Sequence, residues 1–117
     1  SLAFYVAFDK AAYLPGEVIR IRFTLINPTA ANLTLHFTSS YCMDYEILRS
    51  QTVLYQWSQH EVFLQWVWTM TLAPFETRTY DFNHTSSDYP LRPGVYEVHG
   101  WVVPYADDYV PLVVVDA

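Results

Sequence analysis

The sequence predicts an all-β protein with an immunoglobulin-like antiparallel β-sandwich of about eight or nine strands. Three observations support this prediction. Apolar residues recur at every second position in several short runs, proline and glycine punctuate these runs, and no run has the three-to-four-residue spacing of an amphipathic helix. The 117 residues are expected to form one domain, residues 1–117, because two separate cores would each be too small.

Alternating runs mark the expected strands, and the clearest covers residues 18–26, where arginine and threonine separate the apolar positions. The expected strands are residues 2–8, 18–26, 33–38, 43–47, 63–72, 79–82, 96–102 and 110–115, and a further strand ends at Trp57. The side chains expected to face the core are Ile19, Ile21, Phe23, Leu25, Leu33, Leu35, Phe37, Met43, Tyr45, Ile47, Leu64, Trp66, Trp68, Met70, Leu72, Tyr80, Phe82, Tyr96, Val98 and Val102. Residues between them, including Asp44 and Glu46, are expected to point away from the core.

Turn signals separate these runs, because proline fixes φ and glycine permits positive φ. They are Leu14-Pro15-Gly16, Asn27-Pro28-Thr29, Ala73-Pro74, the polar stretch 83–89, Arg92-Pro93-Gly94 and the stretch 104–108.

Residues 91–96, Leu-Arg-Pro-Gly-Val-Tyr, have the form of a tyrosine corner. In this motif a tyrosine near the start of a late strand donates its hydroxyl to the backbone upstream and fastens the crossing between the two sheets. Pro93 and Gly94 would make the turn, and Tyr96 would make the hydrogen bond. The alternative is an ordinary Pro-Gly turn followed by a core tyrosine.

The charge balance argues against a nucleic-acid partner. Six Lys and Arg residues against twelve Asp and Glu give a net charge of −6, and phosphate binding needs clustered positive charge. Cys42 is the only cysteine, which leaves no intrachain disulfide and no cysteine zinc site. The longest apolar stretches, such as 110–115, are strand-length, so no membrane insertion is expected.

No catalytic site is predicted. The four histidines, His36, His60, His84 and His99, occur without H-E-x-x-H spacing, and His36 and His99 are expected to be solvated on the outer faces of strands. Residues 84–88 contain His, Ser and Asp, but a polar hairpin loop explains them better, because triad members usually come from separate segments.

No metal or cofactor is predicted either. Asp107 and Asp108, with Asp9 or Asp116 nearby, are the only candidates for a calcium site. Calcium takes six to eight oxygen ligands, and the sequence does not supply that number here. Two solvated aspartates in a turn are the expected outcome.

Binding of a protein partner is the stronger theme, because ten Tyr and four Trp are residue types enriched in recognition surfaces. Trp57 and Trp101 are expected to be exposed, and the connections 39–43 and 104–111 are candidate binding loops, unless each is an ordinary hairpin connection. The predicted partner-binding residues are Tyr41, Cys42, Met43, Trp57, Trp101, Tyr105, Asp107, Asp108 and Tyr109.

The order of several segments resembles the bacterial intracellular proteinase inhibitor domain, the BsuPI family, over roughly residues 13–103. The segments that carry the resemblance are Y-L-P-G-E at 13–17, I-R-F-T-L-I-N-P-T at 21–29, L-T-L-H-F-T-S-S at 33–40, M-D-Y-E-I at 43–47, Y-Q-W-S at 55–58, F-L-Q at 63–65 and L-R-P-G-V-Y at 91–96. Tyr55 departs from the family pattern, which has tryptophan there, and the glycine turn just before it is absent. The resemblance implies an immunoglobulin-like sandwich and, from the founding member, inhibition of an intracellular subtilisin-type serine protease.

The leading hypothesis is therefore a non-enzymatic protein-binding domain that inhibits a subtilisin-type serine protease in the cytoplasm. The alternative is a structural or adhesive immunoglobulin-like domain of an exported or multidomain bacterial protein, extracellular if a signal peptide was removed before Ser1. An enzyme is the third hypothesis, and it would require His60 and Glu61 to converge with another acidic residue in a deep cleft. The sequence does not fix the oligomeric state.

Overall fold

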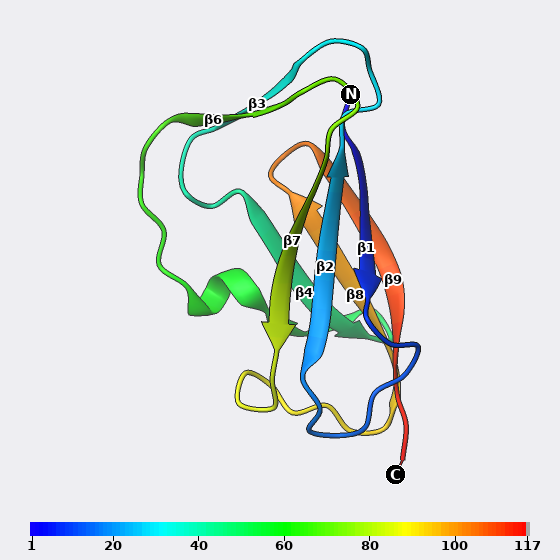
Figure 1. Cartoon of the computed structure of the whole chain (residues 1–117). Coiled ribbons are helices and arrows are strands. Elements are labelled where there is room, and N and C mark those ends of the chain that lie inside the picture. Colours follow the sequence, from blue (N-terminus) through cyan, green and yellow to red (C-terminus); the bar gives the residue numbers. More distant parts are fainter. Residues whose placement is uncertain (117) are drawn as a thin grey trace.

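The computed structural model describes residues 1–116, which form nine strands and one short 3-10 helix (Figure 1). The elements are β1 (Ala3–Phe8), β2 (Ile19–Ile26), β3 (Leu33–Phe37), β4 (Met43–Arg49), β5 (Thr52–Gln56), η1 (Trp57–His60), β6 (Trp68–Leu72), β7 (Thr77–His84), β8 (Gly94–Val102) and β9 (Ala106–Val114).

Two antiparallel sheets face each other, in the orders β1-β2-β7 and β5-β4-β8-β9, and this arrangement confirms the predicted immunoglobulin-like sandwich. β3 and β6 pair only with each other and form a two-stranded ribbon, here called the arm, which projects from one end of the sandwich (Figure 1). β3 lies on the path from β2 of one sheet to β4 of the other, and β6 lies on the path back from η1 to β7. The two long connections that flank it therefore lie outside the sandwich.

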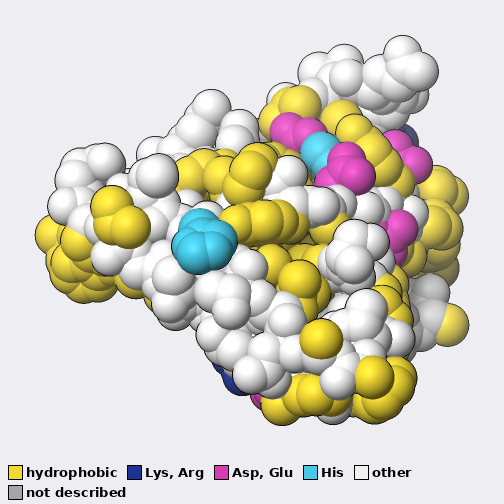
Figure 2. All heavy atoms as spheres, turned by 90° about the horizontal axis from the view of Figure 1, so that it is seen from above, with side chains coloured by type: hydrophobic (Ala, Val, Ile, Leu, Met, Phe, Trp, Pro, Cys, Tyr) yellow, Lys and Arg dark blue, Asp and Glu magenta, His cyan; other side chains and the backbone are white. Residues whose placement is uncertain are grey.

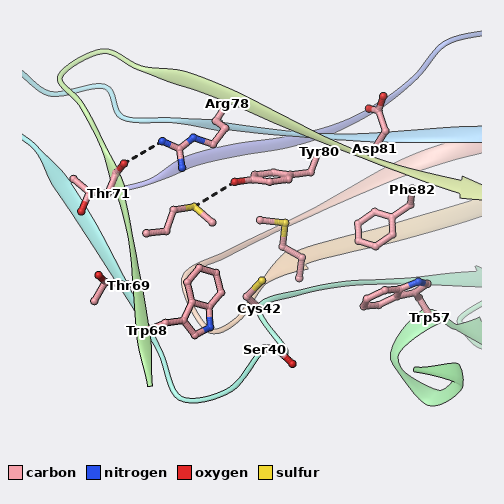
Figure 3. Close-up of a pocket in the computed structure, with 12 residues that line it drawn as sticks. Ser40, Cys42, Trp57, Trp68, Thr69, Thr71, Arg78, Tyr80, Asp81 and Phe82 are labelled. Carbon is pink, nitrogen blue, oxygen red and sulfur yellow. Dashed lines mark hydrogen bonds between the residues drawn. The ribbon is translucent and has the colours of Figure 1, made fainter. Parts of the chain in front are cut away.

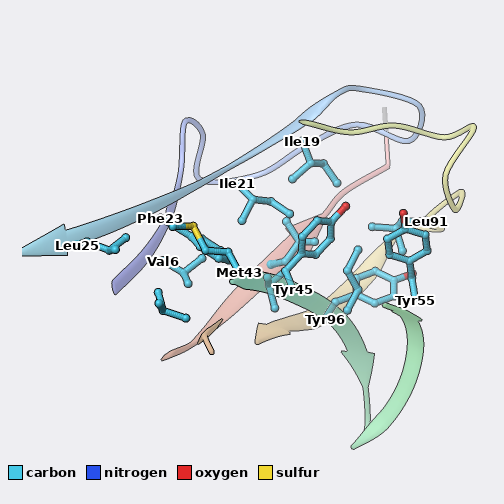
Figure 4. Close-up of a cluster of buried hydrophobic side chains, with 14 of the residues drawn as sticks. Val6, Ile19, Ile21, Phe23, Leu25, Met43, Tyr45, Tyr55, Leu91 and Tyr96 are labelled. Carbon is cyan, nitrogen blue, oxygen red and sulfur yellow. The ribbon is translucent and has the colours of Figure 1, made fainter. Parts of the chain in front are cut away.

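The core lies between the two sheets, and the inward-facing residues predicted for β2 are confirmed, although Thr24, predicted to face outward, is also buried at 5% exposed. Ile19, Ile21, Phe23 and Leu25 are all at most 4% exposed. Figure 4 shows side chains of β2 meeting those of the opposite sheet, such as Tyr45. Burial of several large apolar side chains without a disulfide makes packing the main source of stability.

The strand predicted for residues 63–72 is wrong in its first half. β6 begins only at Trp68, and Leu64 and Trp66, predicted to face the core, are 55% and 51% exposed. Apolar residues occupy both alternating faces of this run, so periodicity does not determine which face is buried. Residues 61–67 also have no partner strand that would include them in a sheet.

Three further expectations are wrong. Residues 106–111 are not a loop but the first part of β9, paired along its length with β8. Asp44, expected to point outward, is fully buried, and His84, expected in a polar loop, is buried at the end of β7. Asp44 is buried because neighbouring donors satisfy its carboxylate, as described below.

The tyrosine corner is confirmed. The hydroxyl of Tyr96 donates a 2.6 Å hydrogen bond to the carbonyl of Arg92, across the turn made by Pro93 and Gly94. The guanidinium of Arg49 lies 5.1 Å from the centre of the Tyr96 ring and covers its face. The corner joins the start of β8 to the connection that arrives from the other sheet.

Tyr96→Phe is expected to lower the free energy of unfolding by roughly 0.5–3 kcal/mol, because it removes one hydrogen bond and leaves the Arg92 carbonyl without its donor. Chemical denaturation of the two proteins measures the difference. An unchanged unfolding midpoint would show that the hydroxyl contributes nothing to the corner.

His84 makes the stability depend on pH. Burial lowers its pKa, and its ring is held in one tautomer, because Nε2–H donates to the Tyr89 carbonyl (2.9 Å) and Nδ1 accepts from the Tyr45 hydroxyl (2.9 Å). In the unfolded chain His84 has an ordinary pKa of about 6.5 and is protonated below that pH, whereas in the folded protein it stays neutral to a lower pH. The contribution of His84 to stability is therefore expected to be fully present above pH about 6.5 and to be lost as the pH falls below that value toward the lowered pKa of the folded state. Denaturation at pH 7.5 and 5.5 tests this, and equal stabilities at the two values would contradict it.

Candidate functional site

Residues 61–67, here called the exposed segment, connect η1 to β6 on the outside of the molecule (Figure 1). No turn or bend interrupts the segment, so it runs as an extended chain. Four of its apolar side chains are open to solvent: Val62 is 92% exposed, Leu64 55%, Trp66 51% and Val67 79%. Single exposed apolar residues are normal, but four within six positions form a patch of the kind that binds partners.

The arm and most of its connections contain no charged residue. None of residues 23–43 and 62–75, which include the arm and most of its connections, is Asp, Glu, Lys or Arg. Seen from above, hydrophobic side chains gather at the projecting end of the molecule, and the acidic side chains lie mainly toward the opposite end (Figure 2). The arm is thus a neutral projection on a protein whose net charge is −6.

Two backbone hydrogen bonds hold the middle of the exposed segment. The Leu64 N–H donates to Oγ of Ser40 (2.8 Å), and the Ser40 N–H donates to the Leu64 carbonyl (2.9 Å). At the end of the segment the indole N–H of Trp68 donates to the Ser39 carbonyl (2.7 Å). The predicted loop 39–43 therefore supports the exposed segment directly.

Phe63 anchors the segment from the inside. Its ring is half-buried and meets Tyr41 at 5.0 Å and Trp57 at 5.8 Å between ring centres, both edge-on. Trp57 in turn packs edge-on against Phe82 of β7 at 4.9 Å. This chain of aromatic contacts connects the exposed segment to the core.

Asp44 fastens the two connections that carry these anchors. Its buried carboxylate accepts hydrogen bonds from the Tyr41 hydroxyl (2.7 Å), from Nε2 of Gln56 (3.0 Å) and from the Ser58 N–H (3.1 Å), besides the Tyr45 N–H (2.8 Å). Tyr41 belongs to loop 39–43 and Ser58 to η1. One side chain of β4 therefore fixes both supports of the exposed segment.

A groove of about 540 Å³ lies beside these supports, between the arm and β7 (Figure 3). Its lining is mostly apolar, and Trp68, Cys42 and Tyr80 point into it. Two contacts bridge it: the Arg78 guanidinium donates to the Thr71 carbonyl (3.1 Å), and the Tyr80 hydroxyl donates to the sulfur of Met70 (3.7 Å).

The groove has little capacity for catalysis. Burial raises the pKa of the Cys42 thiol, which disfavours the reactive thiolate, and no histidine lines the groove. Elsewhere His60 stacks flat on Tyr55 (4.9 Å between ring centres) and makes no hydrogen bond to Glu61 within residues 1–116. The convergence that an enzyme hypothesis required is not found among the described residues. No group of three or more His, Cys, Asp or Glu side chains within residues 1–116 could hold a metal ion.

The first set of predicted binding residues lies under the exposed segment rather than in front of it. Tyr41 and Cys42 are half-buried, and Met43 is buried in the core. Trp57 and Trp101, expected to be exposed, are both half-buried. The Trp101 indole N–H donates to the Tyr41 hydroxyl (3.2 Å), so this tryptophan also braces loop 39–43.

The second set lies on the β8–β9 hairpin. His99, expected to be solvated, has a side chain only 15% exposed, with Nδ1 2.8 Å from Glu46 and Nε2 2.9 Å from Asp107. Its ring is stacked on Tyr109, at 4.0 Å between ring centres. These contacts form a compact surface on the sheet, where the sequence predicted a binding loop framed by prolines.

Tyr105 and Asp108 of the same hairpin make connections within the protein. The Tyr105 hydroxyl accepts from the N–H of His36 (2.6 Å) and donates to its carbonyl (3.0 Å), which ties the hairpin turn to the arm. The carboxylate of Asp108 accepts from the Val6 N–H (2.9 Å) and joins β9 to β1. Both residues therefore have structural partners.

Val62, Leu64, Trp66 and Val67 are candidate contact residues that were not predicted from the sequence. A signal was present, because Phe63 and Val67 are apolar at positions where an ordinary half-buried strand would be polar. A strand that is apolar on both faces is buried only if other elements pack against both faces. A segment on the outside of a sandwich has packing partners on one side at most. Such a run predicts exposed apolar surface.

Within residues 1–116, no helix is long and apolar enough to cross a membrane. No curated protein sequence matches the chain.

Solved structures with the same fold include two large enzymes. The chain superposes on a β-glucosidase from Erythrobacter marinus (TM-score 0.60, 12% identity, 98% of this chain and 15% of that one). It also superposes on a Paenibacillus sp. cycloisomaltooligosaccharide glucanotransferase (TM-score 0.62, 15% identity, 94% of this chain and 13% of that one). A CARDB domain from Pyrococcus furiosus, solved in complex with di-metal ions, matches over 98% of this chain and 88% of that one (TM-score 0.58, 14% identity). At these identities the likeness shows the fold alone.

The family profile described as intracellular proteinase inhibitor, BsuPI, matches residues 6–106. The match covers the second half of β1, all of β2 to β8 and therefore the complete arm, including the exposed segment and loop 39–43. It confirms the resemblance found in the sequence and extends it at both ends. The chain therefore belongs to the BsuPI family of intracellular proteinase inhibitors.

Proposed function

We propose that this protein inhibits a serine protease of the subtilisin type by binding it non-covalently, without catalysis and without a cofactor. The observation that carries the proposal is the family match over residues 6–106. The exposed segment supports the proposal, because it is extended, open to solvent and held at its middle by Ser40 and at its C-terminal end by Trp68. A rigid contact segment loses little conformational freedom on binding, so more of the contact energy appears as affinity.

Titration of the purified protein against a panel of subtilisin-type proteases tests the proposal. We expect dose-dependent loss of peptide hydrolysis with the inhibitor recovered intact, and no effect of the same preparation after heat denaturation. Lack of inhibition at micromolar excess, or digestion of the protein as a substrate, would refute the proposal.

The second candidate function is a structural or adhesive domain of a larger protein. The two large enzymes favour it, because their immunoglobulin-like part is only 15% and 13% of each chain. The genomic sequence that flanks the described chain discriminates between the two functions. Neighbouring domains or an export signal in the same reading frame would favour the structural role, and a free-standing coding sequence would favour the cytoplasmic inhibitor.

A further inference from the structure

We propose that the exposed segment, residues 61–67, is the part of the protein that enters the protease's substrate cleft, where it pairs as an added β-strand through the main chain of Phe63 and Gln65. This inference rests on the proposed function and names its contact site. The partner surface is an extended, uncharged peptide-binding cleft with apolar subsites.

The hydrogen bonds of Leu64 determine which edge of the segment is free. In an extended chain the N–H and C=O of one residue point to the same side, and successive residues alternate. Both main-chain groups of Leu64 are used by Ser40. The main-chain groups of Phe63 and Gln65 therefore point away from loop 39–43, and they make no hydrogen bond within residues 1–116.

The free edge of the segment behaves like the edge of a sheet. Unpaired N–H and C=O groups along an extended chain are a template for another strand, and strand addition is a common mode of peptide recognition. Proteases hold the peptide they act on as an extended strand, so a segment of this shape fits their cleft without rearrangement. The supports at Ser40, Phe63 and Trp68 keep it in that shape before binding.

The side chains of the segment select the chemistry of the cleft. Val62, Leu64, Trp66 and Val67 present apolar surface, and Glu61 is the only charged residue of the segment. A charged specificity pocket in the protease would find no opposite charge on these apolar side chains. Its charged group would be desolvated on contact without compensation, so the segment does not suit such a pocket. Trp66 offers the largest exposed side chain and is the expected centre of the contact, because tryptophan is enriched at energetic hot spots.

The β8–β9 hairpin is a weaker candidate for this role. Residues 106–111, predicted as a loop, are paired with β8 across the sheet, and Asp107 and Tyr109 are engaged by His99. β9 is the outer strand of its sheet, so its second edge is the alternative site for strand pairing, but its side chains are engaged within the protein and it offers no apolar patch like that of the exposed segment. The hairpin therefore serves as an internal comparison.

Matched substitutions test the assignment. Trp66→Ala and Leu64→Asp are expected to weaken inhibition roughly 30-fold or more, as judged from the inhibition constant. Val95→Asp on β8, where the valine is 64% exposed, is the control and is expected to change the inhibition constant less than about twofold. Tyr109→Ala on β9 tests the rival site on the hairpin, and a loss of inhibition as large as that of Trp66→Ala would favour the hairpin over the exposed segment. Thermal unfolding of every variant verifies that it is folded.

Amide hydrogen exchange tests the strand pairing itself. In the free protein the Leu64 amide is expected to exchange slowly and the Phe63 and Gln65 amides quickly. In the complex, Phe63 and Gln65 are expected to become protected at least about tenfold.

The possible outcomes separate the two proposals. If the wild-type protein inhibits and the segment variants inhibit equally well, or if protection appears on the β8–β9 hairpin instead, the exposed segment is not the contact site, although the inhibitor function stands. If the wild-type protein inhibits no protease, both proposals fail. If size-exclusion chromatography shows a dimer that Leu64→Asp dissociates and no protease complex forms, the free edge binds a second copy and the assignment to a protease is wrong.

Discussion

Asp44→Ala is expected to lower the free energy of unfolding by roughly 3–5 kcal/mol, one of the two largest losses among the substitutions considered for this protein. The carboxylate is fully buried and accepts four hydrogen bonds. Alanine would remove this shared acceptor, and of the four donor groups Nε2 of Gln56 has a further acceptor, Oγ of Ser58 (3.1 Å). Urea denaturation monitored by tryptophan fluorescence measures the loss.

Two comparisons make the Asp44 prediction specific. Asp44→Asn keeps one acceptor oxygen and is expected to cost less than alanine. Asp81→Ala removes a solvent-exposed pair with Arg22 (2.8 Å) and is expected to cost no more than about 1 kcal/mol. A loss for Asp44→Ala as small as that for Asp81→Ala would contradict the role assigned to the buried carboxylate.

Gly100→Val is expected to lower the free energy of unfolding by about 3 kcal/mol or more, because the opposite sheet leaves no room for a side chain at this position. A Cβ on residue 100 would lie 2.7 Å from Cε1 of Phe23 and 2.7 Å from Cγ2 of Val6. Phe23 is fully buried and Val6 is 4% exposed, so neither can move into solvent. Thermal and chemical denaturation measure the loss.

A double-mutant cycle identifies the cause. Phe23→Leu makes a smaller ring-free side chain opposite residue 100, so the double variant is expected to be more stable than the sum of the two single losses indicates. Strict additivity would show that Gly100→Val acts through something other than contact with Phe23.

The sequence predicts the sandwich well where one face of a strand is polar. In β2 Arg20 and Arg22 mark the outer face, and the inner residues were identified correctly. β5 was harder to define, because the turn before it uses Ser50 and Gln51 with φ of 50° and 68° and contains no glycine. The bounds of β5 become clear only from its pairing with β4 in the structure.

The candidate site was predicted only in part, for a related reason. Burial of Asp44 depends on donors from three other segments, which meet it only in the folded chain. Loop 39–43 was identified as a candidate, and in the structure its residues hydrogen-bond to the exposed segment and pack against it. The exposed segment was not predicted, because its apolar residues are typical of a core strand. Only the structure shows that residues 61–67 have no partner strand.

Several residues that carry the family resemblance stabilise the fold. The side chain of Asn27 donates to the carbonyls of Ala31 (2.7 Å) and Ala73 (3.0 Å), where the chain leaves and re-enters the sandwich. Asp44 fixes loop 39–43, and Tyr96 closes the corner before β8. These motifs therefore report mainly on the fold, and the variable properties of an inhibitor are expected on the solvent side of the exposed segment.

The uncharged arm also bears on how the protein behaves in concentrated solution. An unpaired strand edge with exposed apolar side chains promotes self-association. The net negative charge on the rest of the surface opposes it, because the molecules repel one another. That mutual repulsion vanishes near the isoelectric point, about 4.9. Colloidal stability is therefore lowest in mildly acidic buffer, the same range in which protonation of His84 weakens the fold.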